Sequence, residues 1–152
     1  MTAPLLVFGW GNPSRGDDAL GPLFIERLRA TLAEAQQAGR VELLDDFQLQ
    51  VEHTLDLVGR ERVLFVDASL DATPPFEAHA IAAEPDAGCS THALSPQALL
   101  QVYRDLHGAD APPCTLLAIR GEGFGLGQPL SAPATANLDA ALRWFSSWFD
   151  AA

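Results

Sequence analysis

The chain has 152 residues, of which 48% are hydrophobic and 19% charged, a composition typical of one folded domain rather than a disordered segment. All nine basic residues are arginines, and 20 Asp and Glu residues bring the net charge to −11. Nucleic acids and anionic membranes require basic patches, so this charge argues against both as partners. No stretch approaches the ~20 apolar residues of a membrane span, and two cysteines are too few for a disulfide framework. We expect a single cytoplasmic domain over residues 1–152.

The first structural signal is an apolar run, residues 5–8, that enters a glycine-rich turn followed by two adjacent acids, Asp17 and Asp18. This pattern predicts a strand, a loop with little side-chain bulk and the start of a helix. In open α/β sheets, ligand sites lie at the carboxyl ends of the strands. Both carboxylates are therefore candidates for a functional site.

Three interpretations of this turn compete. A dinucleotide site would need a third glycine where Ser14 stands, and two acids at the helix start would repel a pyrophosphate. A purely structural turn would use Asp17 as the cap of a helix beginning near Ala19. A carboxylate site for a metal or for proton transfer would use Asp18, because adjacent residues on a helix point about 100° apart. On this view Asp17→Asn, which keeps an acceptor, would leave activity near normal.

The rest of the chain alternates between helical and extended patterns. Apolar residues at helical spacing predict helices over residues 20–38, 48–57, 95–106 and 133–149. Short apolar runs predict further strands over residues 41–44, 62–67, 76–82 and 115–119. The run at 76–82 alternates apolar and polar residues, as a half-exposed edge strand does, and places His79 on the polar side. His53 is interpreted as a surface or capping residue, because no other ligand type accompanies it at metal-binding spacing.

Asp67 ends the third predicted strand, whose four consecutive apolar residues are typical of a strand covered on both faces. A carboxylate there is costly unless it is paired or lies at a site, although Asp also forms turns. The order of elements predicts a three-layer α/β/α sandwich with helices on both faces of the sheet. If the first strand is central, the switch point falls between the first and third strands, and Asp18 and Asp67 reach the same crevice.

Two later segments are also candidates for a functional role. His92 stands in a loop before the helix at residues 95–106, and Cys89 three residues earlier gives an alternative nucleophile with His92 as its base. Two Asp and one His form a mixed oxygen and nitrogen set that suits nickel, zinc or iron better than calcium or magnesium. The glycine-rich stretch at residues 121–127 is either a substrate-binding segment or a mobile connection.

The opening GWGNPSRGDDALGP resembles that of the hydrogenase maturation proteases, endopeptidases that trim the C-terminus of the large subunit of nickel–iron hydrogenases. In that family an apolar strand runs into G-x-G-N, a short spacer and D-[DE]-[GA]-x-G. The matching residues here are Gly9, Gly11, Asn12, Asp17, Asp18, Ala19 and Gly21. Asp67, within Val-Asp-Ala, and His92 also stand where the family has functional residues. The family's Q-L-x-P-E-L segment is matched only at Gln48 and Leu49.

The resemblance implies a mostly parallel five-stranded sheet with one antiparallel strand. It also implies catalytic carboxylates at Asp18 and Asp67, and a nickel site formed by Asp18, Asp67 and His92. The nickel would arrive with the substrate, the large-subunit precursor, and we expect a monomer. The nucleophile stays open: H-E-x-x-H is absent, and a water activated by the metal, with Asp18 or Asp67 as base, is one solution. The alternatives are a non-catalytic nickel-dependent binding or chaperone module and a small-molecule binding protein with structural acids.

Overall fold

Five strands form one sheet in the order β2-β1-β3-β5-β4, in a computed structural model that describes residues 2–85 and 94–151. Four strands are parallel: β1 (Leu5–Trp10), β2 (Val41–Asp46), β3 (Arg62–Ser69) and β5 (Cys114–Arg120). The fifth, β4 (Phe76–Ile81), pairs antiparallel with β5 at one edge. The predicted mostly parallel sheet with one antiparallel edge strand is confirmed, and His79 is exposed on β4 as expected.

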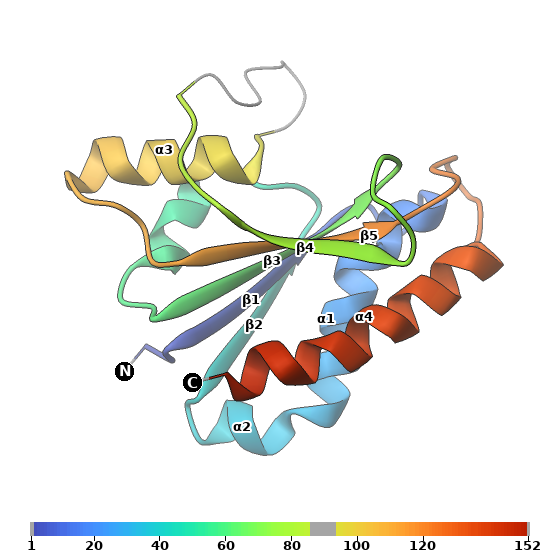
Figure 1. Cartoon of the computed structure of the whole chain (residues 1–152), viewed down its shortest axis with the longest axis horizontal. Helices are drawn as coiled ribbons and strands as arrows, with labels where there is room; N and C mark the ends of the chain where they lie inside the picture. The colour runs from blue at the N-terminus through green and yellow to red at the C-terminus, as the bar shows by residue number, and fades with distance from the viewer. Residues whose placement is uncertain (1, 86–93, 152) are drawn as a thin grey trace.

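Helices cover both faces of this sheet (Figure 1). The helices α1 (Leu20–Thr31), α2 (Ala33–Gln37) and α4 (Ala132–Asp150) lie on one face. The helix α3 (Pro96–His107) and the 3₁₀ segment η2 (Val51–Leu57) lie on the other. Alternate residues of β1 enter two separate cores: Val7 packs with the α1 and α4 side, and Leu6 and Phe8 pack with η2 and α3. This alternation follows from the two-residue period of a strand. The predicted three-layer sandwich is confirmed.

Three local predictions need correction. The helix expected over 20–38 is divided at Leu32, because the Thr31 hydroxyl donates back to the carbonyls of Arg27 and Leu28 and bends the chain. The helix expected over 48–57 is the shorter 3₁₀ segment η2. His53 caps this segment by accepting the Gln50 N–H at 2.8 Å, which confirms the interpretation of His53 as a capping residue.

The third correction concerns the end of β3, which was expected at Asp67. The strand runs on to Ser69, because its pairing with β5 continues as far as Arg120. Asp67 therefore lies inside the paired part of the strand, opposite Ala118, rather than in a turn. Its backbone is fixed by the sheet, which removes the interpretation of Asp67 as a turn-forming residue.

Glycines allow the start of α1 to lie directly against the sheet. A Cβ at Gly9 would stand 2.5 Å from the Gly21 carbonyl oxygen, and one at Gly21 would overlap the Trp10 backbone and approach the Val66 oxygen to 3.0 Å. Gly11, at φ +148°, has the Asp18 backbone where its Cβ would be. The 3₁₀ turn η1 (Gly16–Ala19), which precedes α1, is thus held against β1 by backbone contact.

We expect Gly21→Ala to lower the free energy of unfolding by at least about 3 kcal/mol, the upper part of the range for overpacking. The loss should occur even though alanine favours a helix by about 1 kcal/mol. Gly39→Ala is the control, because Gly39 has open space around its Cα and only the strain of φ +72° to contribute, about 1–2 kcal/mol. Urea denaturation followed by circular dichroism measures both, and equal losses would contradict the steric argument.

Candidate functional site

The site lies at the carboxyl ends of β1 and β3. The strand that follows β1 in the chain, β2, lies on one side of β1, and the next strand, β3, lies on the other side. The topological switch point therefore falls between β1 and β3. Asp18 comes from η1, directly after β1, and Asp67 comes from β3. Both side chains are half-buried, and the Asp18 carboxylate accepts the Asn12 N–H at 2.7 Å. The structure brings these two predicted residues close enough for the charge of one to act on the other.

The two carboxylates influence each other electrostatically. Removal from water raises the pKa of Asp67 to about 7, the negative charge of Asp18 adds to the rise, and a hydrogen bond from the Ala68 N–H opposes it. Asp67 therefore exchanges its proton near neutral pH, the range in which a general acid or base works best. A cation bound between the two groups would relieve both the desolvation and the repulsion. The pair is chemically suited to proton transfer or to holding a metal.

The raised pKa of Asp67 makes a prediction about stability. The folded state binds this proton up to about pH 7, whereas the unfolded chain releases it near the ordinary aspartate pKa of 3.8. Ionising Asp67 therefore costs stability as the pH rises between these values, and the full cost applies above the folded pKa. We expect Asp67→Asn to melt at a higher temperature than the wild type at about pH 8, with the difference shrinking at about pH 5. A lower melting temperature for the variant at both pH values would contradict the electrostatic account.

His92 and Cys89 lie outside the described residues, so the third predicted ligand and the alternative Cys–His pair stay predictions. Within residues 2–85 and 94–151, no group of three His, Cys, Asp or Glu side chains could hold a metal ion. The donor set available there is the oxygen pair of Asp18 and Asp67, which fits a cation that brings or finds further ligands. The described residues therefore do not supply a complete set of metal ligands by themselves.

Asp17 has a different role from the one its position in the sequence indicates. It is fully buried, and neither η1 nor α1 has a side-chain cap, so the prediction that Asp17 caps the helix is wrong. Its carboxylate accepts the backbone N–H groups of Glu122, Gly123 and Ser131, at 2.7, 3.2 and 2.7 Å, and the Ser131 hydroxyl at 2.7 Å. Burial alone would raise the pKa of Asp17, but these hydrogen bonds outweigh it and hold the pKa below its usual range.

The partners of Asp17 are 105 to 114 residues away in the sequence, so no local pattern could have found them. The difference also has a chemical consequence. A carboxylate offers acceptors on both oxygens, and Asp17 uses both. An asparagine at this position would keep only one, so the expectation that Asp17→Asn behaves nearly normally loses its basis.

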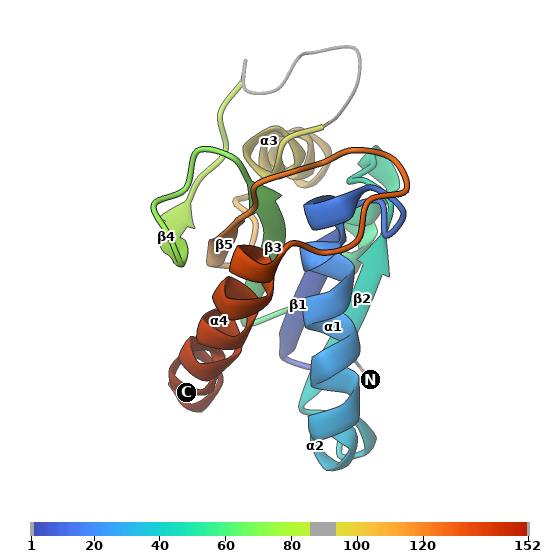
Figure 2. The same cartoon turned by 90° about the vertical axis from the view of Figure 1, so that its right-hand side faces the viewer.

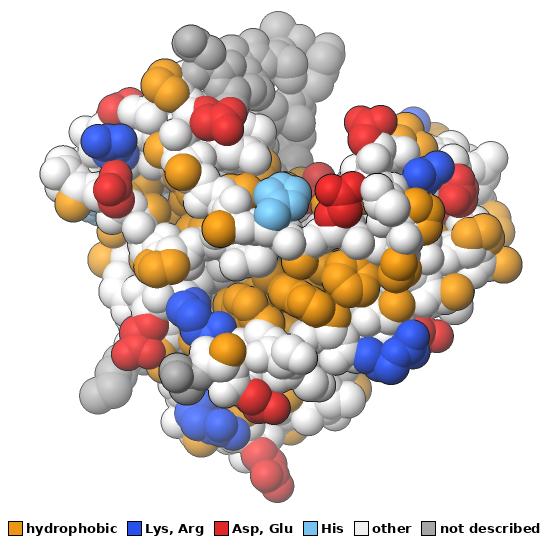
Figure 3. All heavy atoms as spheres, in the orientation of Figure 1, with side chains coloured by type: hydrophobic (Ala, Val, Ile, Leu, Met, Phe, Trp, Pro, Cys, Tyr) orange, Lys and Arg blue, Asp and Glu red, His pale blue; other side chains and the backbone are white. Residues whose placement is uncertain are grey.

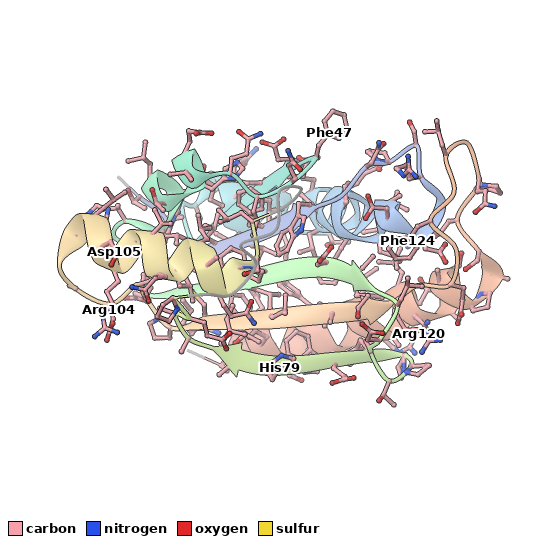
Figure 4. The ribbon with its side chains drawn as sticks, turned by 90° about the horizontal axis from the view of Figure 1, so that it is seen from above. Phe47, His79, Arg104, Asp105, Arg120 and Phe124 are labelled. Carbon is pink, nitrogen blue, oxygen red and sulfur yellow. The ribbon has the colours of Figure 1, made fainter. Side chains whose placement is uncertain are left out.

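The glycine-rich segment after β5 is anchored to the turn that carries Asp18. Figure 2 shows this loop crossing over the start of α1. The Gly16 N–H donates to the Gln128 carbonyl at 3.1 Å, the Asp17 N–H to Gly123 at 2.8 Å and the Gly127 N–H to Ser14 at 2.7 Å. Figure 4 shows Arg120 and Phe124 at this end of the sheet, with Phe124 packed against the core on the α1 and α4 side. The segment is therefore a fixed part of the site's frame rather than a loose connection.

The surface charge does not mark a docking face by itself. Figure 3 shows acidic and arginine side chains scattered over one face, with a hydrophobic band over β4 and α4. Phe76 of β4 and Trp144 of α4 lie with their ring centroids 5.9 Å apart. In the part of the chain that the structure describes, no helix is long and apolar enough to cross a membrane.

This chain is similar to known proteins by comparison of structures. No family model matches it, and no curated protein matches it by sequence. The hydrogenase maturating endopeptidase HybD from E. coli matches with a TM-score of 0.75 and 22% identity, over 97% of this chain and 91% of that one. The NiFe hydrogenase maturation protease HycI from Thermococcus kodakarensis matches with a TM-score of 0.70 and 22% identity, over 97% and 92%.

A third structure extends the likeness to another source. The hydrogenase 2 maturation peptidase from a Thaumarchaeota archaeon matches with a TM-score of 0.67 and 22% identity, over 96% of this chain and 97% of that one. The likeness covers both layers of helices and the whole sheet rather than the glycine turn alone. Over nearly its whole length, the chain has the fold of the hydrogenase maturation proteases.

Proposed function

We propose that this protein is an endopeptidase that removes a C-terminal peptide from the nickel-loaded large-subunit precursor of a nickel–iron hydrogenase. The observation that supports this most directly is the pair Asp18 and Asp67, which face one crevice at the switch point of a fold shared with maturation endopeptidases. Asp18, Asp67 and His92 recognise the nickel that the precursor carries. The protein works as a cytoplasmic monomer.

The electrostatics of the pair fit a metal that arrives with the substrate. Without a cation, the two carboxylates repel each other and Asp67 retains a proton near neutral pH. Arrival of nickel displaces that proton, because a ligand must be deprotonated, so recognition strengthens as the pH rises through about 7. Because Asp67 is partly protonated in the metal-free protein, free metal has to compete with that proton and is released easily. The site therefore binds best to nickel that the precursor already holds.

The peptide bond to be cut is brought to the crevice by the same contact. Nickel, when bound, can polarise a carbonyl or a water. Asp18 and Asp67 hold the metal-bearing segment in place, and the carboxylate oxygens that the metal does not use accept the proton of the attacking water. Positioning of the scissile bond beside a fixed base accounts for cleavage without a serine or cysteine nucleophile.

The deciding experiment incubates the protein with a nickel-loaded large-subunit precursor and follows the released peptide by mass spectrometry. We expect release by the wild type and none by Asp18→Asn or His92→Ala. Circular dichroism spectra should be unchanged: Asp18 is half-buried, and its replacement by an amide of similar size leaves no core cavity. Asp71→Asn and His79→Ala are matched controls, since both side chains are exposed and lie outside the crevice, and both should cleave normally.

Other outcomes would point elsewhere. A stable complex with the precursor but no released peptide would favour a nickel-dependent binding or chaperone module. No interaction with the precursor would reject the proposed function altogether. Normal cleavage by both Asp18→Asn and His92→Ala would reject the assignment of these residues while leaving the activity in place.

A further inference from the structure

We propose that Asp17 is a positioning residue: with the loop after β5 it forms a clamp that fixes the spacing between Asp18 and Asp67. The clamp consists of Asp17, residues 121–123 and Ser131. This inference rests on the proposed function in one respect: the proposed function is what gives Asp18 and Asp67 a shared role. The clamp itself is argued from hydrogen bonds and packing.

Three consecutive N–H groups connect the two sides of the crevice. Gly121 donates to the carbonyl of Ser69 at 2.9 Å, two residues beyond Asp67 on β3. The next two groups, those of Glu122 and Gly123, donate to one oxygen of Asp17 at 2.7 and 3.2 Å. A span of three residues therefore runs from the neighbourhood of Asp67 to the residue before Asp18. Its length sets how far apart the two carboxylates can lie.

A helix joins the same carboxylate from the other side. Ser131 donates its N–H and its hydroxyl to Asp17, at 2.7 Å each, and its hydroxyl also accepts the Ala134 N–H at 3.2 Å as the N-cap of α4. Asn137 on α4 donates to the Arg120 carbonyl at 3.0 Å, which holds that helix to the end of β5. Asp17 thus ties η1 to α4 and to the loop after β5, which Gly121 in turn joins to β3.

Close packing leaves this clamp little room to adjust. A Cβ at Gly121 would stand 3.0 Å from the Cβ of Asp17. Gly16, at φ +56°, would bring a Cβ to 2.5 Å from the Gly123 carbonyl oxygen. The turn η1 therefore cannot move away from the loop without breaking the hydrogen bonds between the Asp17 carboxylate and its four donors.

A clamp is needed here because the side chain of Asp18 has few restraints of its own. Within the described residues, its carboxylate has a single hydrogen bond, from the Asn12 N–H at 2.7 Å. The position of Asp18 therefore depends on the backbone that Asp17 holds in place. The Asn12 N–H is in turn a direct reporter of where the Asp18 carboxylate lies.

The test measures amide hydrogen exchange in Asp17→Asn, Ser131→Ala and Ser95→Ala by NMR, with no metal or precursor present. Asparagine can accept at one atom only and turns an NH₂ group toward the loop's donors. We expect exchange at Glu122 and Gly123 to accelerate in Asp17→Asn, and exchange at Asn12 to accelerate by at least about ten-fold. Ser131→Ala should give the same pattern with smaller changes, because it removes one of the four bonds to Asp17.

Ser95→Ala is the matched control. Ser95 caps α3 through the Ala98 N–H at 3.1 Å, as Ser131 caps α4, but it is not a hydrogen-bond partner of Asp17. Its loss should lower stability by a similar amount and leave Asn12 exchange unchanged. If Asp17→Asn accelerates exchange at Glu122 and Gly123 but not at Asn12, Asp17 anchors the loop alone and the positioning role is overturned. Should Asp17→Asn fail to fold, the same comparison in Ser131→Ala decides.

A second measurement connects the clamp to ligand recognition. Calorimetric titration with Ni²⁺ alone should show at least about ten-fold weaker binding to Asp17→Asn than to the wild type, at a temperature where both are folded. Wild-type affinity in a variant whose Asn12 exchange has accelerated would overturn the link between clamp and site. If the wild type neither binds Ni²⁺ nor cleaves precursor, the proposed function fails, whereas the exchange result still decides on the clamp.

Discussion

The contact between the start of α1 and the strand β1 is the constraint on which the rest of the site depends. Gly9 and Gly21 meet backbone to backbone, with no space for a Cβ at either position. This contact places η1 over the carboxyl end of the sheet and makes the loop between them short. The carboxylate of Asp18 is then delivered to the edge of β3 by backbone geometry rather than by a long flexible side chain.

Two neighbouring residues of the same type perform opposite tasks because their surroundings differ. Asp17 is buried among four donors, which favour its charged form and make it a structural anchor. Asp18, one residue later, is half-buried, and its negative charge raises the pKa of Asp67. A substitution of Asp17 therefore acts by removing hydrogen bonds that stabilise the fold. A substitution of Asp18 acts by removing a charge from the site.

The site carries an electrostatic cost that the fold has to support. Asp67 is paired with Ala118 of β5 and directly follows Val66, the last residue of β3 that pairs with β1, so the sheet fixes its backbone. Its desolvation is therefore fixed as well. Such a cost is typical of functional positions, where a group is held in an unfavourable state that a ligand relieves. The hydrogen bonds around Asp17 offset part of this cost, since buried charge-assisted bonds are the strong ones.

The sequence by itself determined the layers, the half-exposed edge strand β4 and the meeting of Asp18 with Asp67, while the resemblance to a known family implied the mostly parallel sheet in which β4 runs antiparallel. The layers and the edge strand follow from hydrophobic period, and the meeting of the two acids follows from the chain order that sets a switch point. Only the tertiary structure decided the role of Asp17, the anchoring of residues 121–131 and the continuation of β3 to Ser69. These depend on hydrogen bonds between segments far apart in the chain, which exist only once packing has brought a donor and an acceptor together.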